Sequence, residues 1–122
     1  MTPFGAKLRQ LRDQRNITLK EMALALNVSS AYLSALEHGK RGTPTWAMVQ
    51  RIIAYFNVIW DEAEELQRLA EMSDPRVVID TAGLNPKATE LANRLATEIS
   101  KIEETALNEL IMMVRRAAAN AS

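Results

Sequence analysis

Few side chains in this sequence are suited to catalysis or to holding a metal ion. The chain has no cysteine, and His38 is its one histidine. It therefore supplies no thiolate and no second imidazole with which to build a nucleophile and base or a zinc ligand set. Since it also lacks a glycine-rich phosphate loop, we expect neither enzyme activity nor a cofactor.

Basic side chains offer the chemistry that remains, and in one half of the chain they outnumber the acidic ones. Acidic and basic residues number 15 each, and the formal net charge of zero alone argues against a polycation that coats nucleic acid. Residues 1 to 59, however, carry eight basic and three acidic residues (+5), and residues 60 to 122 carry seven and twelve (−5). The first half is thus suited to bind phosphate, with a salt-sensitive affinity.

The elements that must position these charges are helices. Four glycines, four prolines and almost no alternation of β-branched and aromatic residues favour an all-α fold. Apolar residues at helical spacing predict five short helices in residues 1 to 72, which must share one core because none is stable alone. Residues suited to cap a helix N-terminus precede four of them, at Thr2, Thr18, Ser29 and Thr45.

A motif for ligand recognition lies in residues 19 to 38, LKEMALALNVSSAYLSALEH. It places a short helix, a three-residue turn and a second short helix in one unit. Ala23 is small where the helices cross, and Val28 and Leu33 hold the second helix at a steep angle with its opposite side free. Over about residues 4 to 58 the sequence resembles the Cro/CI-type (xenobiotic response element) helix-turn-helix regulators of bacteria and phages.

Two features depart from the family pattern. Asn27 stands where the family most often has glycine, and the loop GKRGTPT before the fourth helix is about one residue longer than usual. Asparagine tolerates the left-handed conformation that glycine would supply, so we expect the turn to be kept. Because the loop is longer, we expect its residues to contact phosphates at other positions than in the family pattern.

The resemblance implies that the helix from Ser30 to His38 enters the major groove of a double-stranded DNA operator. The residues expected to contact bases are Ser30, Ala31, Tyr32, Ser34 and Ala35. None is Arg, Asn or Gln, so we expect direct contacts to discriminate only weakly between bases. Sequence-dependent DNA shape then supplies part of the specificity. Packing of Tyr32 against the preceding helix is the alternative for that side chain.

The resemblance also implies contacts that hold the reading helix in place. Phosphate contacts are expected from Thr18, Lys20, Lys40, Arg41, Thr43 and Thr45. Arg12 and Glu37 match a helix 1 arginine and a recognition-helix glutamate that form a structural ion pair in this family.

Beyond the five helices we expect a linker at residues 73 to 85, in which one short strand is an open alternative, and then one long helix in residues 86 to 122. No glycine or proline interrupts the segment from Pro86 to about Ala119. Its apolar stripe advances near 3.67 residues per turn and is too long for a compact domain to cover. We therefore predict dimerisation through Leu91, Leu95, Ile99, Ile102, Ala106, Leu110 and Met113. Folding of this helix back onto the first domain is the alternative.

Together these features predict a cytoplasmic, nucleoid-associated regulator of transcription. We expect a repressor that binds an inverted-repeat operator as a homodimer and makes no contact with a membrane. The alternative is an antitoxin-like protein that binds a protein partner through its C-terminal region and regulates its own synthesis by binding DNA.

Overall fold

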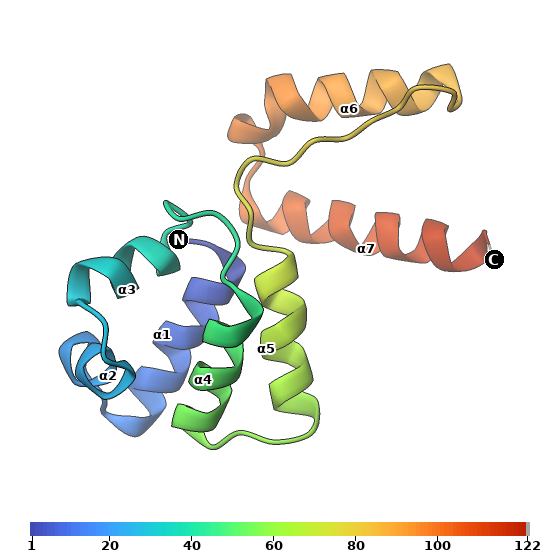
Figure 1. The fold of residues 1–122 in the computed structure, drawn as a ribbon. Helices are drawn as coiled ribbons and strands as arrows, with labels where there is room; N and C mark the ends of the chain where they lie inside the picture. Colours follow the sequence, from blue (N-terminus) through green and yellow to red (C-terminus); the bar gives the residue numbers. More distant parts are fainter. Residues whose placement is uncertain (122) are drawn as a thin grey trace. The chain divides into compact units, whose positions relative to one another are not determined.

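The chain folds into two compact units. The computed structural model describes residues 1 to 121; the first unit spans Met1–Val77 and the second begins at Val78. The first unit contains α1 (Pro3–Arg15), α2 (Leu19–Leu26), α3 (Ser30–Glu37), α4 (Trp46–Phe56) and α5 (Asp61–Glu71) (Figure 1). The second contains α6 (Pro86–Glu98), the 3-10 turn η1 (Ile99–Lys101) and α7 (Glu104–Asn120). The all-α prediction is confirmed, and residues 73 to 85 contain no strand.

Four of the five helices in the first unit begin at the capping residues that the sequence predicts. Thr18 accepts a hydrogen bond from the amide of Glu21 at 3.0 Å, and the Glu21 carboxylate accepts from the Thr18 amide at 3.4 Å. This reciprocal pair fixes the start of α2. α2 ends at Asn27, which is left-handed at φ 58° and ψ 44°, as expected for the residue in place of glycine. The helices α1, α3 and α4 are capped in the same way by Thr2, Ser29 and Thr45.

One apolar core unites the five helices. α1 packs against α3 and α5, and α4 packs against α2 and α5. Leu8, Leu33 and Leu66, from three different helices, are fully buried, and each contributes about 2 kcal/mol relative to an exposed side chain. The buried apolar residues are Phe4, Leu8, Leu11, Met22, Ala23, Leu26, Leu33, Leu36, Met48, Val49, Ile52, Phe56, Val58, Leu66 and Ala70.

The prediction of one continuous helix after Pro86 is wrong. The helix ends at Glu98 and passes through η1 to Ile102, which is extended at φ −91° and ψ 126°, before α7 begins. The break falls in the sequence TEISKI, where threonine, isoleucine and serine are weaker helix formers than the alanine and leucine around them. The Thr97 hydroxyl also donates to the carbonyl of Asn93 at 2.9 Å, a contact that often bends helices.

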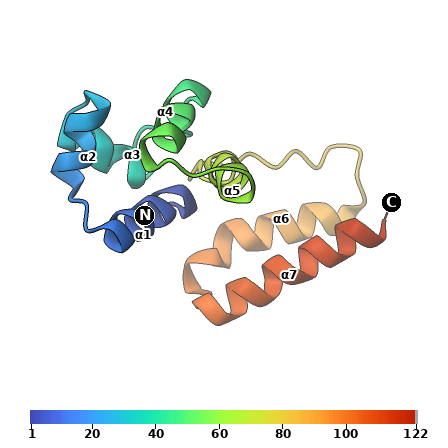
Figure 2. The same ribbon diagram turned by 90° about the horizontal axis from the view of Figure 1, so that it is seen from below.

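The second unit is a helical hairpin without a buried core. α6 and α7 run side by side in opposite directions in both views (Figures 1 and 2). Neither helix buries a residue, and the least exposed side chains, which include Leu95 and Leu107, are only half-buried. The residues predicted to form one dimerisation stripe lie on two helices and the turn between them: Leu91 and Leu95 on α6, Ile99 on η1, Ile102 after it, and Ala106, Leu110 and Met113 on α7.

Candidate nucleic-acid interface

The helix α3 is fixed on one side by the core and open on the other. Leu33 and Leu36 are buried in the core, and the amide of Val28 donates to the carbonyl of Ala23 at 3.0 Å in the turn before α3. Ala23 is only 2% exposed, which is consistent with a small residue at the crossing of α2 and α3. The first unit therefore presents the free side of α3 as a surface.

A buried ion pair connects α3 to α1. The guanidinium of Arg12 donates to both carboxylate oxygens of Glu37, with 3.2 Å between Nη2 and Oε1. The two side chains are 9% and 3% exposed. Two charges removed from water to this extent must be paired, because either one alone carries a large desolvation cost. The structure thus brings the predicted structural pair together at the C-terminal end of α3.

The backbone of Glu37 is held by a second set of contacts that the sequence analysis missed. Its carbonyl oxygen accepts from the amide of Thr2 at 3.0 Å and lies 3.2 Å from the Thr2 hydroxyl. The same carbonyl occupies the space in which a Cβ at Gly5 would stand. A glycine inside a helical pattern indicates a special packing requirement at that position, but not which backbone it approaches.

The five residues expected to contact bases all lie on α3. Ser30 and Ala31 are exposed at its N-terminus, and Tyr32, Ser34 and Ala35 are partly exposed. Tyr32 also packs against the core, which accounts for its partial burial. The guanidinium of Arg41 lies over the Tyr32 ring, 4.9 Å from its centroid. Nothing in the spacing of these two residues indicates this contact, because the loop between them determines it.

The six residues expected to contact phosphates lie at the start of α2 and around the loop between α3 and α4. All six are exposed, and the hydroxyls of Thr18 and Thr45 each accept the hydrogen bond that caps a helix. The exposed cations Lys20, Lys40 and Arg41 stand near those two helix starts. Because a helix N-terminus also carries partial positive charge, both places are suited to a phosphate group.

The basic residues of the first half divide into two groups of four. One group is engaged inside the first unit: Lys7 near Glu62 and Glu65, Arg12 with Glu37, Arg15 with Phe56, and Arg51 with the Leu26 carbonyl. The other group, Arg9, Lys20, Lys40 and Arg41, is exposed and forms no ion pair within residues 1 to 121. Three of these four belong to the predicted phosphate contacts.

In the part of the chain that the structure describes, no cluster of histidine, cysteine, aspartate or glutamate has the size to hold a metal ion. α3 ends at Glu37, one residue earlier than predicted, and His38 caps it with its Nδ1 atom 2.8 Å from the carbonyl of Ser34. No helix in the described residues combines the length and the apolar character that crossing a membrane requires.

Comparisons with known proteins agree with this geometry. A family model described as a helix-turn-helix domain matches residues 3 to 69. The chain is 41% identical over 61 residues to the uncharacterized HTH-type transcriptional regulator RghRB of Bacillus subtilis (strain 168), a match covering 50% of this chain and 44% of that protein. It is 40% identical over 52 residues to the HTH-type transcriptional repressor RghR of the same organism, covering 43% and 38%.

A third relative has a different name for its regulatory effect. The chain is 41% identical over 71 residues to the HTH-type transcriptional activator BcrR of Enterococcus faecalis, covering 56% of this chain and 34% of that protein. The chain therefore spans less than half the length of each of these three relatives. No solved structure matches it significantly.

Proposed function

The chain belongs to the helix-turn-helix domain family, and on this premise we propose that it is a sequence-specific DNA-binding regulator of transcription, of the Cro/CI type, without enzyme activity. The observation that carries the proposal is the placement of α3. One side of this helix is fixed in the core and tied to α1 through Glu37, and the other side is open. A helix held in this way keeps its orientation when it enters the major groove.

In the proposed complex α3 reads the base edges and the residues around it bind the backbone. Ser30 and Ala31 stand at the exposed N-terminus of α3, the end from which helices of this type contact bases. Serine hydroxyls bond to several bases, and an alanine methyl suits thymine, so each contact discriminates weakly. Most of the affinity comes from phosphate contacts made by Lys20, Lys40 and Arg41. These contacts set the register of α3 on the DNA but do not discriminate between base sequences.

We further propose that the protein acts as a homodimer, and the apolar side chains of the second unit support this. Leu91 and Ile99 are 54% and 51% exposed, and Met113 is 59% exposed. A second copy would cover these side chains and place two α3 helices on one operator. Two-fold symmetry in the protein then requires an inverted repeat, with half-sites about 34 Å apart or a multiple of this distance.

A repressor is the regulatory effect that we propose, on the support of the relative named as a repressor, RghR. A dimer bound across an operator of this size covers promoter DNA in the cytoplasm, on the nucleoid, and excludes other proteins from it. Because another relative is named as an activator, the experiment must distinguish repression from activation.

Selection of bound fragments from random DNA tests the proposal. The expected result is one enriched inverted repeat that the protein binds at least a thousandfold more tightly than unrelated DNA at physiological salt. A reporter gene placed behind the selected operator then shows lower expression when the protein is present. Absence of any common motif, with affinity that depends on charge alone, would overturn the proposal of a specific regulator.

An antitoxin-like role is a second candidate, and one observation favours it. The segment before α6 exposes Val77, Val78 and Ile79 at 73%, 91% and 58%. Three adjacent apolar side chains in an extended segment are suited to join the edge of a sheet in a partner protein. Co-expression with a small protein encoded beside this chain, and purification of a defined complex that Val78→Asp disrupts, would support this candidate.

A further inference from the structure

We propose that α7 pairs with α7 of a second copy of this chain in antiparallel orientation, about a two-fold axis passing between Met112 and Met113. The inference rests on the homodimer proposed above and adds the direction and register of the pairing. Four observations lead to it: the apolar centre of α7, the symmetry of one of its faces, the distribution of its charges and the lack of ion pairs among them.

The centre of α7 is apolar on every side. Residues 110 to 114, LIMMV, are five consecutive apolar residues, and at 3.6 residues per turn they point around the whole helix. Leu110 is 37% exposed and the other four are 54 to 61% exposed. A helix that is apolar all round is normally a buried helix. α6 runs beside α7 (Figure 2) but leaves these five side chains exposed, so a second copy of α7 can cover them.

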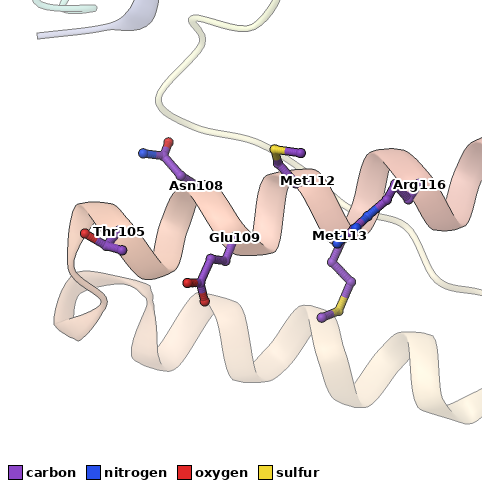
Figure 3. Close-up of a pocket in the computed structure, with 6 residues that line it drawn as sticks. All are labelled: Thr105, Asn108, Glu109, Met112, Met113 and Arg116. Carbon is purple, nitrogen blue, oxygen red and sulfur yellow. The ribbon is translucent and has the colours of Figure 1, made fainter.

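One face of α7 has a symmetric arrangement about its middle. It forms an open hollow lined by Thr105, Asn108, Glu109, Met112, Met113 and Arg116 (Figure 3). Along the helix Met112 and Met113 lie at the middle, with Glu109 three residues before Met112 and Arg116 three residues after Met113, opposite in charge. A two-fold axis through the centre therefore places Glu109 of each copy beside Arg116 of the other.

The charges of α7 are separated by sign along the helix. Three acidic residues precede the apolar centre and two basic residues follow it: Glu103, Glu104, Glu109, Arg115 and Arg116. Parallel pairing in register would set acids against acids and bases against bases, which is destabilising. Antiparallel pairing sets each acidic half against a basic half. The charge distribution therefore selects the antiparallel direction.

The structure of residues 1 to 121 gives these charges no ion-pair partner. Within the described residues none of the five forms an ion pair, whereas Glu90 of α6 lies 3.3 Å from Lys87 and 3.1 Å from Arg94. Glu109 and Arg116 are seven residues apart, beyond the three- or four-residue spacing of pairs on one helix. The two arginines also lie outside the last turn of α7, where the helix dipole acts most strongly.

Single cysteine substitutions measure the direction directly, because the chain has no cysteine of its own. In the proposed register, thiols introduced by Met112→Cys stand next to each other in the dimer. Thr105→Cys is the matched control, since it lies on the same face two turns away. Its two thiols are about 22 Å apart along the axis, far beyond the reach of a disulfide. Mild oxidation of the full-length protein should crosslink the first variant and not the second.

Charge reversal tests the register independently. Glu109→Arg and Arg116→Glu should each weaken the dimer about tenfold, because each brings like charges together twice. The double variant restores opposite charges with the positions exchanged and should recover wild-type affinity. In a parallel dimer in register, position 109 of one copy lies beside position 109 of the other, so like charges meet before and after the reversal. Each single variant would then dimerise as tightly as the wild type, and there would be no loss for the double variant to recover.

The outcomes separate this inference from the proposed function. A monomer in sedimentation at tens of micromolar, together with specific operator binding, would overturn the homodimer as well as the register. A dimer in which Thr105→Cys crosslinks as readily as Met112→Cys, or in which neither does, would overturn the antiparallel register alone. Loss of operator binding by a dimer that crosslinks as expected would contradict the proposed function and leave the pairing standing.

Discussion

The guanidinium of Arg41 lies over the ring of Tyr32, with its central carbon 4.9 Å from the ring centroid. The contact joins the loop after α3 to the helix proposed to read DNA. A guanidinium that stacks on an aromatic ring keeps its hydrogen-bond donors free in its own plane. Tyr32 therefore orients the donors of Arg41 before DNA arrives.

This orientation predicts that the two side chains act together in DNA binding. Arg41→Ala and Tyr32→Leu should each weaken operator binding. The double variant should lose about 0.5–1 kcal/mol less binding free energy than the two single losses added together. Fluorescence anisotropy on the selected operator measures the three affinities. Lys40→Ala combined with Tyr32→Leu is the control and should be additive, because in the described residues the cation over the Tyr32 ring is Arg41 and not Lys40.

The pair between Arg12 and Glu37 predicts a large loss of stability when one charge is removed. Glu37→Gln leaves Arg12 buried without a counter-charge and should lower the free energy of unfolding by about 3 kcal/mol. Urea denaturation measures the loss, and Glu71→Gln at an exposed position should change stability by less than about 0.5 kcal/mol. Full stability and full operator affinity in Glu37→Gln would show that the pair does not fix α3.

Close packing of α1 on α3 predicts that Gly5→Ala is destabilising. Alanine is the better helix former by about 1 kcal/mol, but its Cβ would collide with the Glu37 carbonyl, a backbone atom that cannot rotate away. We expect a net loss of about 2 kcal/mol. Gln10→Ala, on the exposed side of the same helix, should be neutral or slightly stabilising. An unchanged or higher unfolding midpoint for Gly5→Ala would contradict the close approach.

The division of the basic residues predicts which of them control the salt dependence of binding. Lys20→Ala and Lys40→Ala should each reduce the slope of log affinity against log salt concentration by about one. Lys7→Ala should leave the slope unchanged, because Lys7 lies 3.8 Å from Glu62 and 3.7 Å from Glu65. Equal effects of all three substitutions would mean that overall charge alone determines the affinity.

Separation of the two units predicts that truncation after Leu84 yields a folded monomer. The first unit has its own buried core, whereas the apolar side chains proposed to join two copies belong to the second. The truncated protein should keep its helical circular dichroism and lose cooperative binding to the two half-sites. A truncated protein that sediments as a dimer would place the dimer contact in the first unit instead.

The sequence predicted the parts of the fold that depend on local chemistry. Capping residues such as Thr18 and Ser29 have short-range preferences, so the helix starts and the turn at Asn27 were found correctly. Charge pairing across the core was also predictable for Arg12 and Glu37, but only through the resemblance to a family. The close approach of Gly5 depends on how α1 and α3 pack, which no local pattern specifies.

The break after α6 was not predicted from the sequence, for a different reason. A search for glycine and proline finds no interruption between Pro86 and Ala119, because the break arises from several weak helix formers acting together. Thr97, Ile99, Ser100 and Ile102 each cost only a few tenths of a kcal/mol relative to alanine. No single residue in this segment is a strong helix breaker, so the spacing of apolar residues alone does not reveal the turn.

The segment between α5 and α6 also acts as a tether of defined length. Residues 77 to 85 contain neither helix nor strand, and nine residues extend to at most about 30 Å. In a dimer joined through the second units, two such tethers would hold each reading domain near its half-site at a high local concentration without fixing its angle. We therefore expect affinity to be highest at a half-site spacing of about 34 Å, and to fall gradually rather than abruptly when the spacing is changed.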